Sequence, residues 1–135
     1  VWMGTRHHDA YPSYRNAFLI SGAIGLAIFA LYPVAPPRFL SDQGFVDTVA
    51  LRSRAYRVLQ PPALANPYAA LPSLHVGWDL LVGIGLVRHA GHWVGRALGV
   101  LLPVAMVLAV MTTANHYLVD AVAGAMLALV PSQTR

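Results

Sequence analysis

Apolar residues along the chain gather in four long stretches that are separated by polar or proline-rich segments. The first stretch has 22 consecutive uncharged residues between Arg15 and Arg38. A helix needs roughly 20 apolar residues to cross the hydrocarbon layer of a bilayer, so this stretch is long enough. The pattern therefore predicts four transmembrane helices, at about residues 16–35, 73–91, 94–112 and 116–131.

A long polar segment, residues 36–72, separates the first two predicted spans. Pro33, Pro36 and Pro37 end the first helix, because proline cannot continue the helical hydrogen-bond ladder. The segment is longer than a simple connection requires. We expect an extramembrane loop with a role beyond connection, and a short interfacial helix around Phe45 to Leu59.

The composition agrees with a membrane protein. Hydrophobic residues make up 57% of the 135 residues and charged residues only 10%, against about a quarter charged in an average soluble domain. We predict an all-α, polytopic helical bundle that forms a single membrane domain over residues 1–135. A bundle of four spans is small for a catalytic interior, and the chain opens in a polar stretch, so we expect further helices upstream.

The basic residues give the bundle a weakly preferred orientation. Four spans place both ends of the chain on one side, with five arginines there and four on the side of the long loop. Positive charge favours the cytoplasmic side, so the loop and Arg38 would face away from the cytoplasm. We expect an integral protein of the cell membrane. The absence of cysteine excludes a thiol nucleophile and thiolate metal ligands.

Two predicted spans carry a histidine and an aspartate at the same spacing: His75 with Asp79, and His116 with Asp120. Residues four apart lie on one helix face, so each carboxylate can reach its own histidine. Ionisable groups inside a membrane are costly and usually functional. The alternative is that these pairs only form hydrogen bonds between helices.

Both histidines are predicted at helix starts. Ser73 is the expected N-cap of the helix that holds His75, and Asn115 precedes His116. The unpaired N–H groups at a helix start favour anions such as phosphate. The connectivity brings both starts to the membrane face of Arg38, so three phosphate-compatible elements converge there.

These residues resemble three signatures of the type 2 phosphatidic acid phosphatase superfamily. The stretch PSLH, from Pro72 to His75, resembles its Pro-Ser-x-His signature, and HYLVD supplies His-x-x-x-Asp with His116 and Asp120. The APPRFL stretch with Arg38 resembles the first signature in a divergent branch that includes the inositol phosphorylceramide synthases. Their order and spacing agree over about 120 residues of the sequence.

The resemblance is incomplete in the basic residues of the signatures. Leu31 stands where the first signature has Lys, and Phe39 stands where it has Pro. Ala109 and Val110 stand where the third signature has Ser-Arg. Only Arg38 remains of the basic clamp. Three loop arginines could substitute, or could belong to a loop that binds lipid headgroups: Arg52, Arg54 and Arg57.

The resemblance implies a lipid-phosphate phosphohydrolase or phosphotransferase that forms a phosphohistidine. His116 would attack phosphorus, Asp120 would orient it, and His75 would act as acid and base. The phosphate would be bound by Arg38, Ser73 and the backbone N–H of Leu74. The implied partners are a phospholipid or lipid-phosphate substrate and the membrane, with no nucleic acid, no metal and no cofactor. The acceptor, water or a hydroxyl group, stays open.

Other functions remain possible from the residues alone. A metal ion could lie among the four ionisable residues of the two pairs, His75, Asp79, His116 and Asp120. A vanadate-dependent oxidant on the same fold is a second enzyme class. A transporter or scaffold could use the pairs to relay protons or to join helices.

Overall fold

The computed structural model describes residues 2–47 and 66–132. Their secondary structure is helical, in agreement with the predicted all-α class, apart from one isolated β-bridge. The α-helices are α1 (Trp2–Arg6), α2 (Tyr11–Leu31), α5 (Leu74–His89), α6 (Trp93–Thr112) and α7 (Leu118–Ser132). Two short 3-10 helices, η1 (Pro37–Phe39) and η2 (Ser41–Gln43), follow α2.

The predicted helices occur in the expected order, with shifted ends. α2 begins earlier than predicted because Pro12, near its N-terminus, has the fixed φ that suits a first helical turn. α6 contains Pro103 in its interior. The predicted interfacial helix falls mainly in residues 48–65, outside the described residues, and Phe45 to Asp47 are not helical.

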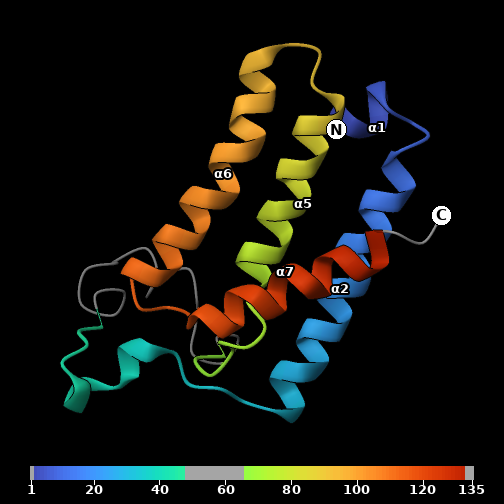
Figure 1. The fold of residues 1–135 in the computed structure, drawn as a ribbon. Helices are drawn as coiled ribbons and strands as arrows, with labels where there is room; N and C mark the ends of the chain where they lie inside the picture. Colours follow the sequence, from blue (N-terminus) through green and yellow to red (C-terminus); the bar gives the residue numbers. More distant parts are fainter. Residues whose placement is uncertain (1, 48–65, 133–135) are drawn as a thin grey trace.

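α5 is the central helix of the bundle. It packs against α2, α6 and α7, and α7 also packs against α2. In Figure 1, α5 lies between α2 and α6, and α7 crosses the lower part of the bundle obliquely. The turn between α5 and α6 lies at one end of the bundle, and η1, η2 and the start of α7 lie at the other.

Glycines allow α5 to approach its neighbours at backbone distance. A β-carbon on Gly77 would collide with the carbonyl group of Gly124 in α7, and one on Gly124 would collide with the carbonyl group of Ser73. On another side of α5, Gly83 faces Gly99 of α6 in the same way. Gly124 and Gly77 therefore permit close packing of α5 and α7.

Two helices, α2 and α6, are long and apolar enough to cross a membrane by length and composition. Only 17% of the apolar stretch in each is buried, so most of its surface is not covered by protein. α5 has 16 residues, and the apolar part of α7, Leu118–Val130, is also shorter than a full span. The other two of the four predicted spans therefore remain predictions.

The segments before Arg38 and before Ser73 are joined by backbone hydrogen bonds. The N–H of Val34 donates to the carbonyl of Tyr68 at 2.7 Å, and the N–H of Ala70 donates to the carbonyl of Val34 at 3.2 Å. This pairing holds the path of the chain that leads into α5 against the chain that leaves α2.

Candidate active site

Arg38 is buried where η1 meets the loop between α6 and α7. Its side chain is only 9% exposed, and its backbone N–H donates to the carbonyl of Ala114 at 2.9 Å. The guanidinium group donates from Nη1 to Oδ1 of Asn115, and its Nε lies 3.5 Å from a carboxylate oxygen of Asp47. A buried charge held on two sides has a fixed direction, which suits the binding of an anion.

His75 is the second residue of α5 and is exposed. The predicted cap is confirmed, because the hydroxyl oxygen of Ser73 accepts a hydrogen bond from the N–H of Val76 at 3.4 Å. Helix geometry leaves the first N–H groups of α5, those of Leu74 and His75, without partners inside the helix. The Ser73 hydroxyl is fully buried, so its role in this structure is to cap the helix.

His116 lies in the loop between α6 and α7, two residues before the helix in which it was predicted. Its ring is only 6% exposed, and Nδ1 lies 2.7 Å from the carbonyl oxygen of Ala70. Because a carbonyl only accepts hydrogen bonds, Nδ1 must carry a proton. The lone pair of the neutral imidazole is therefore on Nε2, the nitrogen that could attack phosphorus.

Asp120 is the most buried ionisable group near His116, with 1% of its surface exposed. Its Oδ2 accepts a hydrogen bond from the N–H of Tyr117 at 2.7 Å and lies 3.7 Å from Nδ1 of His116. That distance is beyond a direct hydrogen bond but close enough for strong attraction between charges. The backbone carbonyl of Asp120 accepts from the N–H of Ser73 at 2.9 Å, which joins the starts of α5 and α7.

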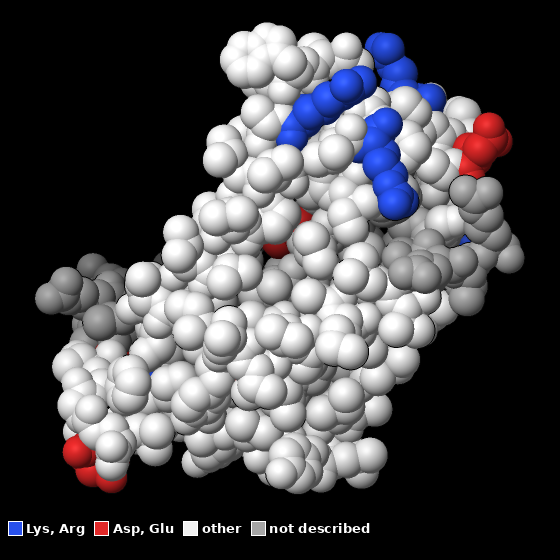
Figure 2. Space-filling view, viewed as in Figure 1, with Lys and Arg blue, Asp and Glu red and all other residues white. Residues whose placement is uncertain are grey.

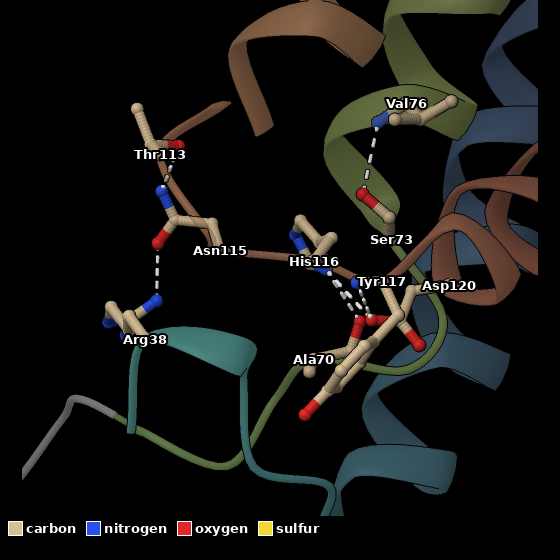
Figure 3. Close-up of polar contacts among 9 residues, drawn as sticks. All are labelled: Arg38, Ala70, Ser73, Val76, Thr113, Asn115, His116, Tyr117 and Asp120. Atoms are coloured by element: carbon tan, nitrogen blue, oxygen red, sulfur yellow. Dashed lines mark hydrogen bonds and ion pairs between the residues drawn. The ribbon is translucent and has the colours of Figure 1, made fainter. Parts of the chain in front are cut away.

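The two histidines meet although 41 positions separate 75 from 116. The centres of their rings are 5.7 Å apart, with the ring planes tilted by 57°. Figure 3 shows His116 between Asp120 on one side and Asn115, which leads to Arg38, on the other. The structure thus brings His75, His116, Asp120 and Arg38 to one end of the bundle, as the sequence predicted.

The surroundings favour a neutral His116. Burial is the largest cause that lowers the pKa of His116 below the ordinary value of 6.5, and the positive charges of His75 and Arg38 lower it further. The hydrogen bond to Ala70 and the charge of Asp120 raise the pKa but do not outweigh burial. A histidine that loses its proton at lower pH keeps its lone pair available over a wider range.

Asp79 does not join this group of residues. One of its carboxylate oxygens is buried and has no hydrogen-bond partner in the part of the chain that the structure describes. No hydrogen bond or ion pair between His75 and Asp79 is formed among the described residues, whereas His116 and Asp120 lie within ion-pair distance. The two pairs are alike in sequence spacing but differ in structure.

The metal-dependent alternative lacks a site in the described residues. Among residues 2–47 and 66–132, no group of three or more His, Cys, Asp or Glu side chains could hold a metal ion. Arg52, Arg54 and Arg57, the possible substitutes for the clamp, lie outside the described residues.

Sequence reasoning missed three groups that position the site. The carbonyl of Ala70 holds His116, while Asn115 and Asp47 contact Arg38. Asn115 was interpreted only as a residue near a helix start, although its place directly before His116 was a usable signal. A backbone carbonyl has no sequence signature, and nothing in the sequence pairs Asp47 with Arg38.

Comparison with known proteins gives one result at the level of the family. A family model described as the PAP2 superfamily matches residues 1–132, almost the whole chain. The comparisons found no matching curated protein and no matching solved structure.

Proposed function

The chain belongs to the PAP2 superfamily, and from this membership we propose that it transfers the phosphoryl group of a lipid phosphate through a phosphohistidine at His116. Superfamily membership supports phosphatase or phosphotransferase activity in general. The observation that carries the specific proposal is the 2.7 Å contact between Nδ1 of His116 and the Ala70 carbonyl. It leaves the lone pair on Nε2, in a ring whose centre lies 5.7 Å from that of His75.

In the first step, Nε2 of His116 attacks phosphorus and forms an N–P bond while the bond from phosphorus to the leaving oxygen breaks. Protonated His75 gives its proton to that oxygen, so the leaving group departs as a neutral alcohol. The imidazole of His116 becomes cationic as it gives up its lone pair. Asp120, with its carboxylate 3.7 Å away, stabilises that positive charge.

In the second step, neutral His75 takes a proton from the acceptor, whose oxygen attacks phosphorus. The N–P bond breaks, and His116 regains its lone pair. Water as acceptor gives a phosphatase, and a lipid or inositol hydroxyl gives a transferase. Arg38 and the free N–H groups at the start of α5 bind the non-bridging oxygens in both steps.

We place the protein in the cell membrane, with the site at its extracytoplasmic edge. The exposed apolar surfaces of α2 and α6 support a lipid environment, because such surfaces are unfavourable in water. The weak excess of arginines at the other end supports the orientation. A substrate whose phosphate lies in the headgroup layer can then reach His75 and His116 without crossing the bilayer.

The test is to trap the phosphoenzyme. The full protein in detergent is incubated with phosphatidate that carries labelled phosphate, then quenched in alkali, which preserves phosphohistidine. His116→Ala should form no labelled protein and lower turnover by on the order of 10³-fold or more. The matched control is His8→Ala, since His8 is exposed near the other end of the chain. Label retained in His116→Ala would contradict the nucleophile.

A further inference from the structure

Asn115 connects Arg38 to the end of α6 through three consecutive hydrogen bonds. Nη1 of Arg38 donates to Oδ1 of Asn115. Nδ2 of Asn115 donates to the hydroxyl oxygen of Thr113 at 2.7 Å, and that hydroxyl donates to the carbonyl of Ala109 at 2.6 Å. Figure 3 shows Asn115 between Thr113 and Arg38.

The direction of this series is fixed at its far end. The carbonyl of Ala109 can only accept, so the hydroxyl proton of Thr113 points toward it. The Thr113 oxygen then accepts from the amide nitrogen of Asn115, which turns the amide oxygen toward Arg38. The opposite amide orientation would set an NH₂ group against the guanidinium, and two donors cannot bond.

Asn115 holds the guanidinium through an amide oxygen and adds no negative charge to that of Asp47, which lies 3.5 Å from Nε. A second carboxylate, at the place of Asn115, would also pair with Arg38 and compete with a phosphate for it. An amide oxygen accepts one N–H and adds no charge that competes with the phosphate. This matters because Arg38 is the only basic residue of the signature motifs that the chain retains.

We propose that Asn115 and Thr113 are positioning residues that aim Arg38 at the phosphate. The inference rests on the proposed function for the identity of the anion, but it makes a separate claim about how the anion is bound. Backbone contacts support the same arrangement, since the N–H of Arg38 donates to the carbonyl of Ala114, the residue between Thr113 and Asn115. The residues that anchor the guanidinium therefore lie on the same loop as His116, between α6 and α7.

The experiment measures the binding of inorganic phosphate to the full protein in detergent, by calorimetry, together with KM and kcat for phosphatidate. Asn115→Ala should weaken phosphate binding and raise KM by about tenfold, with a smaller change in kcat, because a hydrogen bond to a charged group is lost. Asn115→Asp should weaken phosphate binding further. Thr113→Val should reproduce part of the loss, and Thr113→Ser should restore binding.

Thr112→Val is the matched control. Thr112 makes the same kind of bond, from its hydroxyl to the carbonyl of Leu108 at 2.8 Å and more weakly to that of Ala109 at 3.2 Å. Among the described residues, the hydroxyl that accepts from the Asn115 amide is that of Thr113. This variant should bind phosphate as the unmodified protein does. A loss in Thr112→Val equal to that in Thr113→Val would overturn the proposal, because the effect would then belong to the helix end.

A double-mutant cycle separates positioning from a general structural effect. In an Arg38→Ala background, Asn115→Ala should cause no further loss of phosphate affinity, because its effect acts through the guanidinium. Equal losses with and without Arg38 would overturn the inference. If phosphate binds through Arg38 as described but no phosphohistidine forms, the proposed function fails and the positioning role stands.

Discussion

Two oxygen atoms that differ in charge and in distance lie near Nδ1 of His116. The neutral carbonyl of Ala70 lies 2.7 Å from Nδ1, and the carboxylate of Asp120 lies 3.7 Å from it. The nearer acceptor fixes the tautomer before substrate binds. The carboxylate acts mainly when the ring becomes cationic, since unit charges 4 Å apart attract by roughly 4 kcal/mol at an effective dielectric constant near 20. An interaction of this kind stabilises the transition state more than the ground state.

Asp120→Asn tests this division. We expect KM to change little and the rate of phosphohistidine formation to fall by on the order of 10²-fold or more. Because the negative charge of Asp120 raises the pKa of His116, its removal lowers that pKa. The acid limb of the pH profile, already below 6.5, should therefore move to lower pH in the variant. An acid limb that moves upward would contradict the contact between His116 and Asp120.

The residues that meet in the site could be predicted from the sequence, but the groups that orient them could not. Helix starts and chain connectivity bring His75, His116 and Arg38 to one end. The Ala70 carbonyl depends on the loop path, which tertiary contacts such as the pairing of Val34 with Tyr68 and Ala70 decide. Ala114 adopts the left-handed backbone conformation, with φ at 51°. Positive φ is uncommon for residues other than glycine, so an alanine in the sequence does not predict this turn.

At the scale of helices, the site depends on how closely α5 and α7 cross. The glycines let the backbones of α5 and α7 pack in direct contact. The hydrogen bond from the N–H of Ser73 to the carbonyl of Asp120 joins the first turns of these two helices. Four apolar helices were predictable because hydrophobic length and proline positions determine them. The ends of the helices were harder to predict. His116 lies before α7 because the turn around Ala114 leaves residues 113–117 outside both α6 and α7.

Gly124→Ala should damage both stability and activity. The added β-carbon would meet the carbonyl of Ser73, a backbone group that cannot move without moving the start of α5. We expect destabilisation of about 1–3 kcal/mol or more from overpacking, together with a large fall in kcat/KM. Thermal unfolding in detergent and phosphatidate turnover measure the two effects.

The control for this variant is Gly91→Ala, because a β-carbon at Gly91 meets nothing within 4 Å. It should leave both quantities unchanged. Equal behaviour of the two alanine variants would show that α5 and α7 do not cross as described.

At the scale of the whole molecule, the two ends of the bundle differ in character. The site lies at the end of η1 and η2, and Figure 2 shows arginine side chains gathered at the opposite end, where α5 turns into α6. Arg88 in the last turn of α5 and Arg96 near the start of α6 belong to that end. In the proposed orientation, the two ends face opposite sides of the membrane.

The absence of cysteine makes this orientation directly testable. Ser41→Cys and Gly91→Cys place single thiols at exposed positions at opposite ends of the bundle. In sealed, right-side-out vesicles, a membrane-impermeant maleimide should label the first variant and should label the second only after permeabilisation. Labelling of both from the outside would rule out the proposed arrangement.

Ala70 contributes its main-chain oxygen to the site, and every amino acid carries that atom. A saturation library would therefore score position 70 by the size of the side chain alone, since the residue is 2% exposed. Such a library would not test the carbonyl oxygen that orients His116, because no side-chain substitution removes it. The chemical change that tests this oxygen is an ester in place of the amide bond between Ala70 and Leu71. An ester carbonyl is a weaker hydrogen-bond acceptor than an amide carbonyl.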